Sequence, residues 1–286
     1  MTYTTETLPS GLRIICAPSP TDVVYCGIAV DSGTRDEENE ETGIAHFTEH
    51  LTFKGTQRRK AWHIINRMES VGGDLNAYTG KEETVYYCTF PREHFSRAID
   101  LLMDIVLHST YPQHEMEKEV EGVVDEIESY NDSPSELIFD DFEALLFPEH
   151  PLGRNILGDA DRLRQMKSSD ILRYVSRQYR LDRMILFLYG NVSMKDILRC
   201  VNRADMQRDS TENPLPRMKP NAFCPPLRTL YHQEGYSSGS RDDGMPMLWR
   251  KRSAPPASGG PEQPAGRPWH EQPPEPGAEG TQRAGL

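Results

Sequence analysis

The sequence of 286 residues lacks the features that would place it in several common classes of protein. Only 36% of its residues are hydrophobic, and no apolar run approaches the roughly 20 residues that span a bilayer. The five cysteines are scattered and form no C-x-x-C pair, which argues against a disulfide framework or a cysteine-based zinc site. The N-terminus has neither the basic segment nor the apolar core of a secretory signal. We therefore expect a soluble protein in a reducing, cytoplasmic environment.

Charge and missing motifs exclude further functions. The chain has 32 Lys and Arg against 44 Asp and Glu, a formal net charge of −12, and no basic stretch long enough to follow a phosphate backbone. It also lacks the G-x-S-x-G elbow of serine hydrolases and the G-x-x-x-x-G-K-[ST] loop of nucleotide-binding proteins. We expect neither nucleic acid nor a membrane as a partner.

Hydrophobic periodicity divides the chain into a globular part, residues 1–212, and a tail, residues 213–286. In the globular part the patterns predict strands at 3–8, 12–17, 23–32, 74–79, 84–90 and 184–188. They predict helices at 42–53, 60–71, 168–179 and 193–201, and a helical block over 94–147. This order of elements predicts an α+β fold in which helices pack on one face of a mixed β-sheet.

The tail has a different composition. Periodicity is lost after Glu212, and residues 251–286 are rich in Pro, interleaved with Gly, Glu and Gln. Such a segment cannot bury enough apolar surface to form a core. We therefore predict that the tail is disordered.

The string from His46 to His50, H-F-T-E-H, carries the strongest chemical signal. On a helix, His46 and His50 stand one turn apart on the same face, so both imidazoles can reach one metal ion. Glu49 lies between them, close to that face. This H-x-x-E-H order is the inverzincin motif and indicates metal-assisted hydrolysis. Taken alone, so short a string is equally consistent with an amphipathic helix that carries surface histidines.

Two carboxylates further along the chain can complete a metal site. Glu119 and Glu126 lie two turns apart on one face of an acidic predicted helix. Catalytic zinc has three protein ligands and one open position for water, and two histidines with one glutamate are an established set. One carboxylate would bind the metal, and the other would orient a ligand or the water. Spacing alone favours a solvated acidic face, so these residues gain weight only beside the two histidines.

The chemistry of such a site would be the hydrolysis of a peptide bond. Zinc lowers the pKa of its bound water from about 15.7 to near 7 and polarises the scissile carbonyl. Glu49 would act as the general base, accepting the proton of the water and passing it to the leaving amine.

Four ordered segments resemble the pitrilysin, insulinase and mitochondrial processing peptidase family, most closely its bacterial members. They read GIAHFTEHLTFKGT, VGGDLNAYT, EKEVEGVVDEIESYNDSP and HPLGRNILG. The resemblance runs from about residue 3 to residue 201 and implies the N-terminal catalytic half of a zinc peptidase. It implies zinc ligation by His46, His50 and Glu126, with Glu49 as the base and Glu119 as the supporting carboxylate.

The resemblance also implies a place for a peptide substrate. The segment Asn76, Ala77 and Tyr78 looks like the family's edge strand, along which a peptide lies as an added β-strand. Its backbone would hold the substrate with little regard to side chains. Without the resemblance, Asn76 would be interpreted as a turn or capping residue.

The C-terminal part departs from the family pattern. Members of the family have two similar halves, the second of which closes over the first, and residues 202–286 have neither the length nor the pattern of that half. When residues 261–286 are back-translated and read one nucleotide further on, they can give LNNLLGGPGMNSRLNLALRERNGLVY, which resembles a motif of the second half. We hypothesise that residues 213–286 are an out-of-frame remnant of a second domain.

Two functions follow from these observations. The first is a zinc-dependent metalloendopeptidase that acts on peptides or extended segments. The alternative is a catalytically inactive, truncated family member that acts as a binding or subunit-type protein. A half that is built to pack against another should expose apolar surface, which favours self-association or pairing with a second family-like half.

Overall fold

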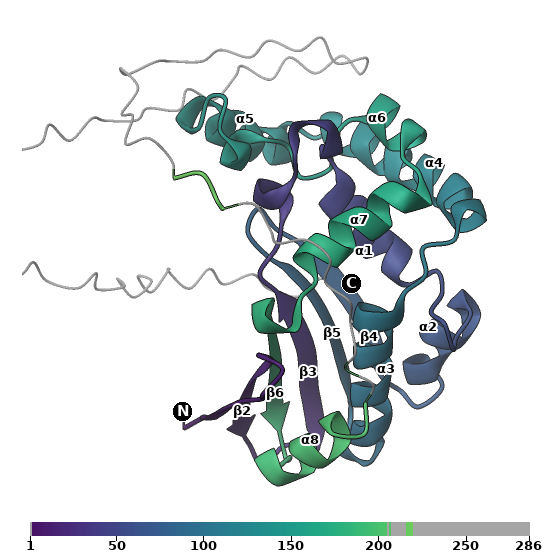
Figure 1. The fold of residues 1–286 in the computed structure, drawn as a ribbon, viewed down its shortest axis with the longest axis vertical. Coiled ribbons are helices and arrows are strands. Elements are labelled where there is room, and N and C mark those ends of the chain that lie inside the picture. The colour runs from purple at the N-terminus through teal and green to yellow at the C-terminus, as the bar shows by residue number, and fades with distance from the viewer. Residues whose placement is uncertain (1, 205, 207–215, 220–286) are drawn as a thin grey trace, which may run out of the picture.

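Six strands form a single mixed sheet in the computed structural model, which describes residues 2–204, 206 and 216–219 (Figure 1). The strands are β1 (Thr4–Thr7), β2 (Arg13–Pro18), β3 (Val23–Val30), β4 (Asp74–Thr79), β5 (Thr84–Pro91) and β6 (Met184–Gly190). Their spatial order is β1-β2-β6-β3-β5-β4. β2 and β6 run parallel, and every other neighbouring pair is antiparallel. The last strand of the described part of the chain, β6, therefore lies inside the sheet, and β4 lies at one edge.

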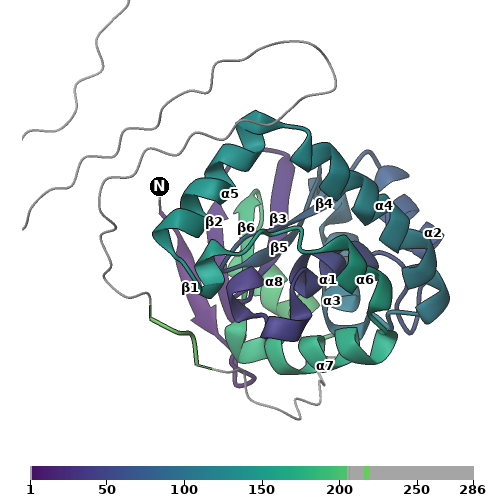
Figure 2. The same cartoon turned by 90° about the horizontal axis from the view of Figure 1, so that it is seen from above.

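Helices cover one face of the sheet and extend beyond one end of it (Figures 1 and 2). They are α1 (Ile44–Thr52), α2 (Ala61–Glu69), α3 (Phe95–His108), α4 (Gln113–Asn131), α5 (Pro134–Leu146), α6 (Ala160–Gln165), α7 (Ser168–Gln178) and α8 (Met194–Val201). α3 packs directly on β3 and β5, whereas α1 and α2 both contact the edge strand β4. In Figure 1, α4, α5 and α6 lie beyond the ends of the strands.

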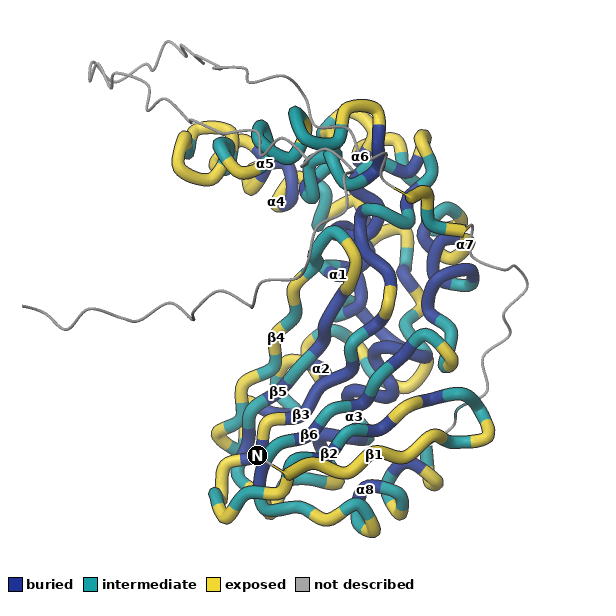
Figure 3. Tube along the Cα trace, turned by 90° about the vertical axis from the view of Figure 1, so that its left-hand side faces the viewer, coloured by how far each residue is buried: buried dark blue, intermediate teal, exposed yellow. Residues whose placement is uncertain are grey.

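The core forms on the helical side of the sheet because strand residues alternate between its two faces. Every second residue of β5 and β6 is fully buried, including Tyr86, Phe90 and Leu186. On the other face most strand residues are exposed or partly buried (Figure 3). Tyr25 of this face is 49% exposed. One face of the sheet thus supplies the core, and the other carries aromatic side chains near the surface.

The predicted α+β class, with helices on one face of a mixed sheet, is confirmed. All six predicted strands are present, and the predicted helices appear with bounds that differ by a few residues. Hydrophobic periodicity missed α6, because a six-residue helix is too short to show a repeat. The sequence nevertheless contains a signal for the start of α6, because Asp159 is a residue type preferred at N-caps. In the structure its side chain accepts a hydrogen bond from the Arg162 N–H at 3.0 Å.

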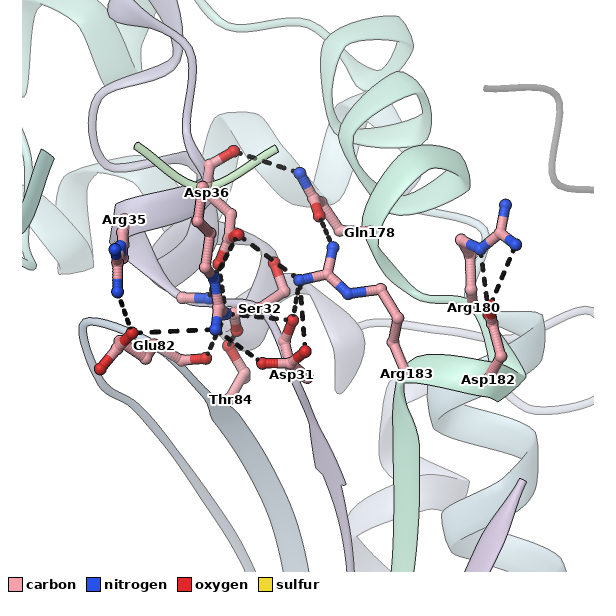
Figure 4. A network of polar contacts seen from close by, with 12 residues as sticks. Asp31, Ser32, Arg35, Asp36, Glu82, Thr84, Gln178, Arg180, Asp182 and Arg183 are labelled. Carbon is pink, nitrogen blue, oxygen red and sulfur yellow. Dashed lines mark hydrogen bonds and ion pairs between the residues drawn. The ribbon is translucent and has the colours of Figure 1, made fainter. Parts of the chain in front are cut away.

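Except for residues 216–219, the tail predicted at 213–286 lies outside the described residues. The reading-frame hypothesis concerns these same residues. Within that short segment, Arg217 donates to the Asp36 carboxylate at 2.8 Å and to the backbone oxygen of Glu82 at 2.8 Å. Glu82, in the turn between β4 and β5, also forms an ion pair with Arg35 (Figure 4). The network therefore joins the β4–β5 turn to the loop that follows β3.

Two further observations concern membrane-spanning helices and the cysteines. None of the helices in the described part of the chain is long and apolar enough to cross a membrane. The cysteines of that part, Cys16, Cys26, Cys88 and Cys200, are free thiols.

A buried carboxylate caps the start of α1, the helix that carries the H-x-x-E-H string. The N-cap residue, Gly43, has a left-handed φ of 90° and no side chain to offer. Glu37 accepts hydrogen bonds from the N–H groups of Gly43 at 3.1 Å and Ala45 at 3.0 Å. It thereby satisfies donors that the first helical turn leaves unpaired. Burial nevertheless raises the pKa of Glu37 to about 8.

We expect Glu37 to make the folded chain less stable as the pH rises from about 4.5 to about 8. Its pKa is higher in the folded chain than in the unfolded one, so folding favours the protonated form, and ionisation costs roughly 1.4 kcal/mol per pH unit over this interval. Glu37→Gln cannot ionise and should flatten this decline, although the loss of one acceptor should cost about 1 kcal/mol at every pH.

Urea unfolding at several pH values measures this slope. Glu40→Gln, which changes an exposed residue of the same loop, is the matched control and should keep the wild-type slope. A Glu37→Gln slope equal to that of the wild type would contradict the prediction.

Candidate metal centre

Helices α1 and α4 bring the three predicted metal ligands together. His46 and His50 lie one turn apart on α1, with ring centroids 4.7 Å apart. Glu126 lies on α4, which packs against α1. His46 Nε2 is 3.7 Å from Glu126 Oε1, and His50 Nε2 is 3.4 Å from Glu126 Oε2. One ligand atom from each residue lies within 4.8 Å of the others, so the three can hold one ion.

The three side chains differ in their access to solvent. His46 is only 6% exposed, His50 is half-buried, and the side chain of Glu126 is 46% exposed. The inner ligand is therefore fixed by packing, while the outer side of the site is open. Two imidazoles and one carboxylate with an open side are the donor set and geometry that suit catalytic zinc.

Burial keeps the inner imidazole in the neutral form that can bind a metal. Burial and, to a smaller extent, the neighbouring His50 together lower the pKa of His46 to about 3. Nδ1 of His46 is buried and has no hydrogen-bond partner in the described part of the chain. The ring is therefore held by packing, with Nε2 directed toward Glu126.

The second imidazole lies in an acidic environment. Burial alone would lower the pKa of His50, but the hydrogen bond with Glu119 and the charges of Glu49 and Glu126 outweigh it and raise the pKa. The same carboxylates that favour a proton on this ring would favour a divalent cation in its place. Metal and proton should therefore compete for His50.

Glu119 orients the outer imidazole. Its Oε1 lies 3.1 Å from His50 Nδ1, which favours the tautomer with the proton on Nδ1 and leaves the Nε2 lone pair facing Glu126. Lys54 forms an ion pair with the same carboxylate. The hydrogen bond from His50, together with Lys54, holds the pKa of Glu119 below its usual range. Sequence reasoning missed Lys54, although its position one turn beyond His50 and opposite an acidic helix was a usable signal.

Glu49 lies beside the metal ligands in a largely buried position. It is 9% exposed, and burial raises the pKa of its carboxyl group, whereas a hydrogen bond from Thr79 opposes this shift. The Thr79 hydroxyl donates to Glu49 Oε2 at 2.7 Å. A carboxylate whose pKa is moved toward neutrality is suited to accept and return a proton. Sequence reasoning placed Thr79 in a strand but gave it no such contact.

The predicted substrate strand lies at the edge of the sheet next to this site. Asn76, Ala77 and Tyr78 belong to β4, which pairs with β5 on one side only. Asn76 and Tyr78 point to the more open face, and Tyr78 is 50% exposed. The structure thus brings all the predicted site residues into one region, formed by α1, α4 and β4.

Curated sequences with similarity to this chain are named as proteases or protease subunits. The chain is 34% identical over 222 residues to the mitochondrial-processing peptidase subunit beta of Saccharomyces cerevisiae, covering 77% of this chain and 48% of that one. It is 35% identical over 195 residues to the uncharacterized zinc protease YmxG of Bacillus subtilis, covering 67% and 48%. The chain spans about half the length of these relatives.

Solved structures share the fold. The periplasmic protease PqqL from Escherichia coli superposes with a TM-score of 0.70 at 23% identity, covering 76% of this chain and 25% of that one. An inactive domain of an M16 peptidase from Pseudomonas fluorescens has the same TM-score, 0.70, at 15% identity, covering 77% and 54%. At these identities the likeness concerns the fold alone.

The family model described as insulinase, peptidase family M16, matches residues 13–160, a range that contains α1, β4 and α4 and hence every predicted site residue. The chain therefore belongs to the insulinase family of peptidases, M16.

Proposed function

We propose that this chain is the catalytic half of a zinc-dependent metalloendopeptidase that cleaves peptides or extended segments of proteins. The observation that carries the proposal is the convergence of His46, His50 and Glu126 on one point, with the carboxylate of Glu49 beside them. Membership of the M16 family and the zinc protease names of relatives support zinc as the metal.

Each residue of the site would have its own role in hydrolysis. A zinc ion bound by the three ligands would polarise the scissile carbonyl and make water more acidic. Glu49 would take a proton from the attacking water and deliver it to the leaving amine, a task that its raised pKa favours. Glu119 would keep the His50 ring in the tautomer that binds the metal.

The edge strand β4 would bind the substrate. A peptide added beside Asn76, Ala77 and Tyr78 would form backbone hydrogen bonds with β4 and lie next to Glu49, because Thr79 of the same strand contacts this base. Backbone recognition of this kind requires an extended substrate and sets little preference for its side chains.

The half-length match favours a partner for this domain. We propose that a second family-like half, or another copy of this chain, packs against it, because the chain spans about half the length of its relatives. An inactive binding or subunit-type protein is the alternative function, and a zinc-loaded chain without peptidase activity would favour it. The cytoplasmic location stays a prediction.

One prediction for the proposed site concerns the metal. We expect one zinc per chain and a loss of zinc affinity of at least about tenfold in Glu126→Gln, because a neutral amide replaces the only charged ligand. Competition with a chromophoric chelator measures the affinity. Glu117→Gln, an exposed change on the same helix, is the matched control and should bind zinc as the wild type does. Equal affinities in Glu126→Gln and wild type would remove Glu126 from the ligand set.

The second prediction concerns the base. Glu49→Gln should retain zinc but cleave a quenched fluorescent peptide at least about 100-fold more slowly, since an amide cannot accept the proton. Zinc content measured on the same samples separates loss of the base from loss of the metal. Cleavage by Glu49→Gln at the wild-type rate would assign the proton transfer to another group.

A further inference from the structure

A single hydrogen bond connects the edge strand to the base. Thr79 is the last residue of β4, and its side chain lies on the face of the strand turned toward α1, opposite to Asn76 and Tyr78. Its hydroxyl reaches Glu49 Oε2 at 2.7 Å. Because an ionised carboxylate only accepts hydrogen bonds, Thr79 must be the donor, and the bond directs one carboxylate oxygen toward β4.

The backbone that presents this hydroxyl is fixed from several sides. Thr79 pairs with Thr84 at the end of the β4–β5 hairpin. In the turn between them, the oxygen of Gly80 accepts from the Thr34 N–H at 3.2 Å, and the oxygen of Lys81 accepts from the Arg35 N–H at 2.8 Å. The Thr84 hydroxyl donates to the oxygen of Ser32 at 2.8 Å, and the ion pair between Arg35 and Glu82 adds a further link (Figure 4). The donor to Glu49 is thus held by a rigid turn.

We propose that Thr79 is a positioning residue, which holds the Glu49 carboxylate in the orientation needed for proton transfer and fixes it relative to the strand that binds the peptide. The inference rests on the proposed function. Thr79 directly follows Asn76, Ala77 and Tyr78, so one rigid segment sets both the place of the substrate and the orientation of the base. The hydroxyl also stabilises the ionised carboxylate in a site where burial disfavours it.

Three variants test this inference. Thr79→Val keeps the shape of the side chain but removes the donor, and it should lower kcat roughly ten- to hundredfold while KM and zinc content stay near the wild-type values. Thr79→Ser keeps a hydroxyl and should recover most of the loss. Thr89→Val is the matched control, because it removes a threonine hydroxyl from the other end of the β4–β5 pair, where Thr89 lies opposite Asp74. It should leave kcat unchanged.

A wild-type kcat in Thr79→Val would overturn the inference, and so would equal losses in Thr79→Val and Thr79→Ser, which would indicate packing and not the hydroxyl. Crystal structures of the zinc-loaded wild type and Thr79→Val provide a readout that does not require turnover. We expect the hydrogen bond in the wild type and a rotated Glu49 carboxylate in the variant. If the wild type binds zinc without cleaving peptides, the proposed function fails, and an unmoved Glu49 in Thr79→Val then separately refutes the positioning role.

Discussion

The packing of α1 between α4 and β4 is the contact on which the rest of the site depends. α1 supplies His46, Glu49 and His50, but the site also needs residues from two other elements. The third candidate ligand comes from α4, and the hydrogen bond to the base comes from β4. A small rotation of α1 would move both imidazoles and the base together, and would separate them from both neighbours. Burial of most of α1 is therefore a functional requirement as well as a source of stability.

The surroundings of the two imidazoles are acidic, since three carboxylates and one lysine lie around them. The carboxylates of Glu49, Glu119 and Glu126 surround the rings, and the charge of Glu126 raises the pKa of Glu49. Lys54 neutralises Glu119 on the side away from the rings. The remaining negative charge lies where a divalent ion would stand, so metal binding should relieve repulsion among groups that folding has forced together.

Sequence analysis predicted the parts of the fold and site that are specified by local hydrophobic and residue-spacing patterns. His46 and His50 could be paired because a helical repeat places them on one face, and the strands could be found from their alternation. Glu126 was different, because spacing alone favoured a solvated acidic face. The need for a third ligand beside the two histidines pointed to Glu119 and Glu126, and the family resemblance selected Glu126 as the ligand. The contact of Thr79 with Glu49 joins residues 30 apart in the sequence, and that of Glu37 with the start of α1 spans an irregular loop. No periodicity encodes either contact.

The place of β6 in the sheet has a consequence for biosynthesis. β6 is the last strand to be made among those of the described residues, yet it lies between β2 and β3 and pairs with both. Until Gly190 has left the ribosome, those two early strands each present an unpaired edge, and unpaired strand edges promote aggregation of nascent chains. Because the insertion of β6 between β2 and β3 joins residues far apart in the chain, it should also be a slow step of folding. The segment that carries the candidate metal ligands is thus synthesised long before β6 completes the sheet that supports it. Chaperones that cover exposed strand edges are the helpers that such a chain would need.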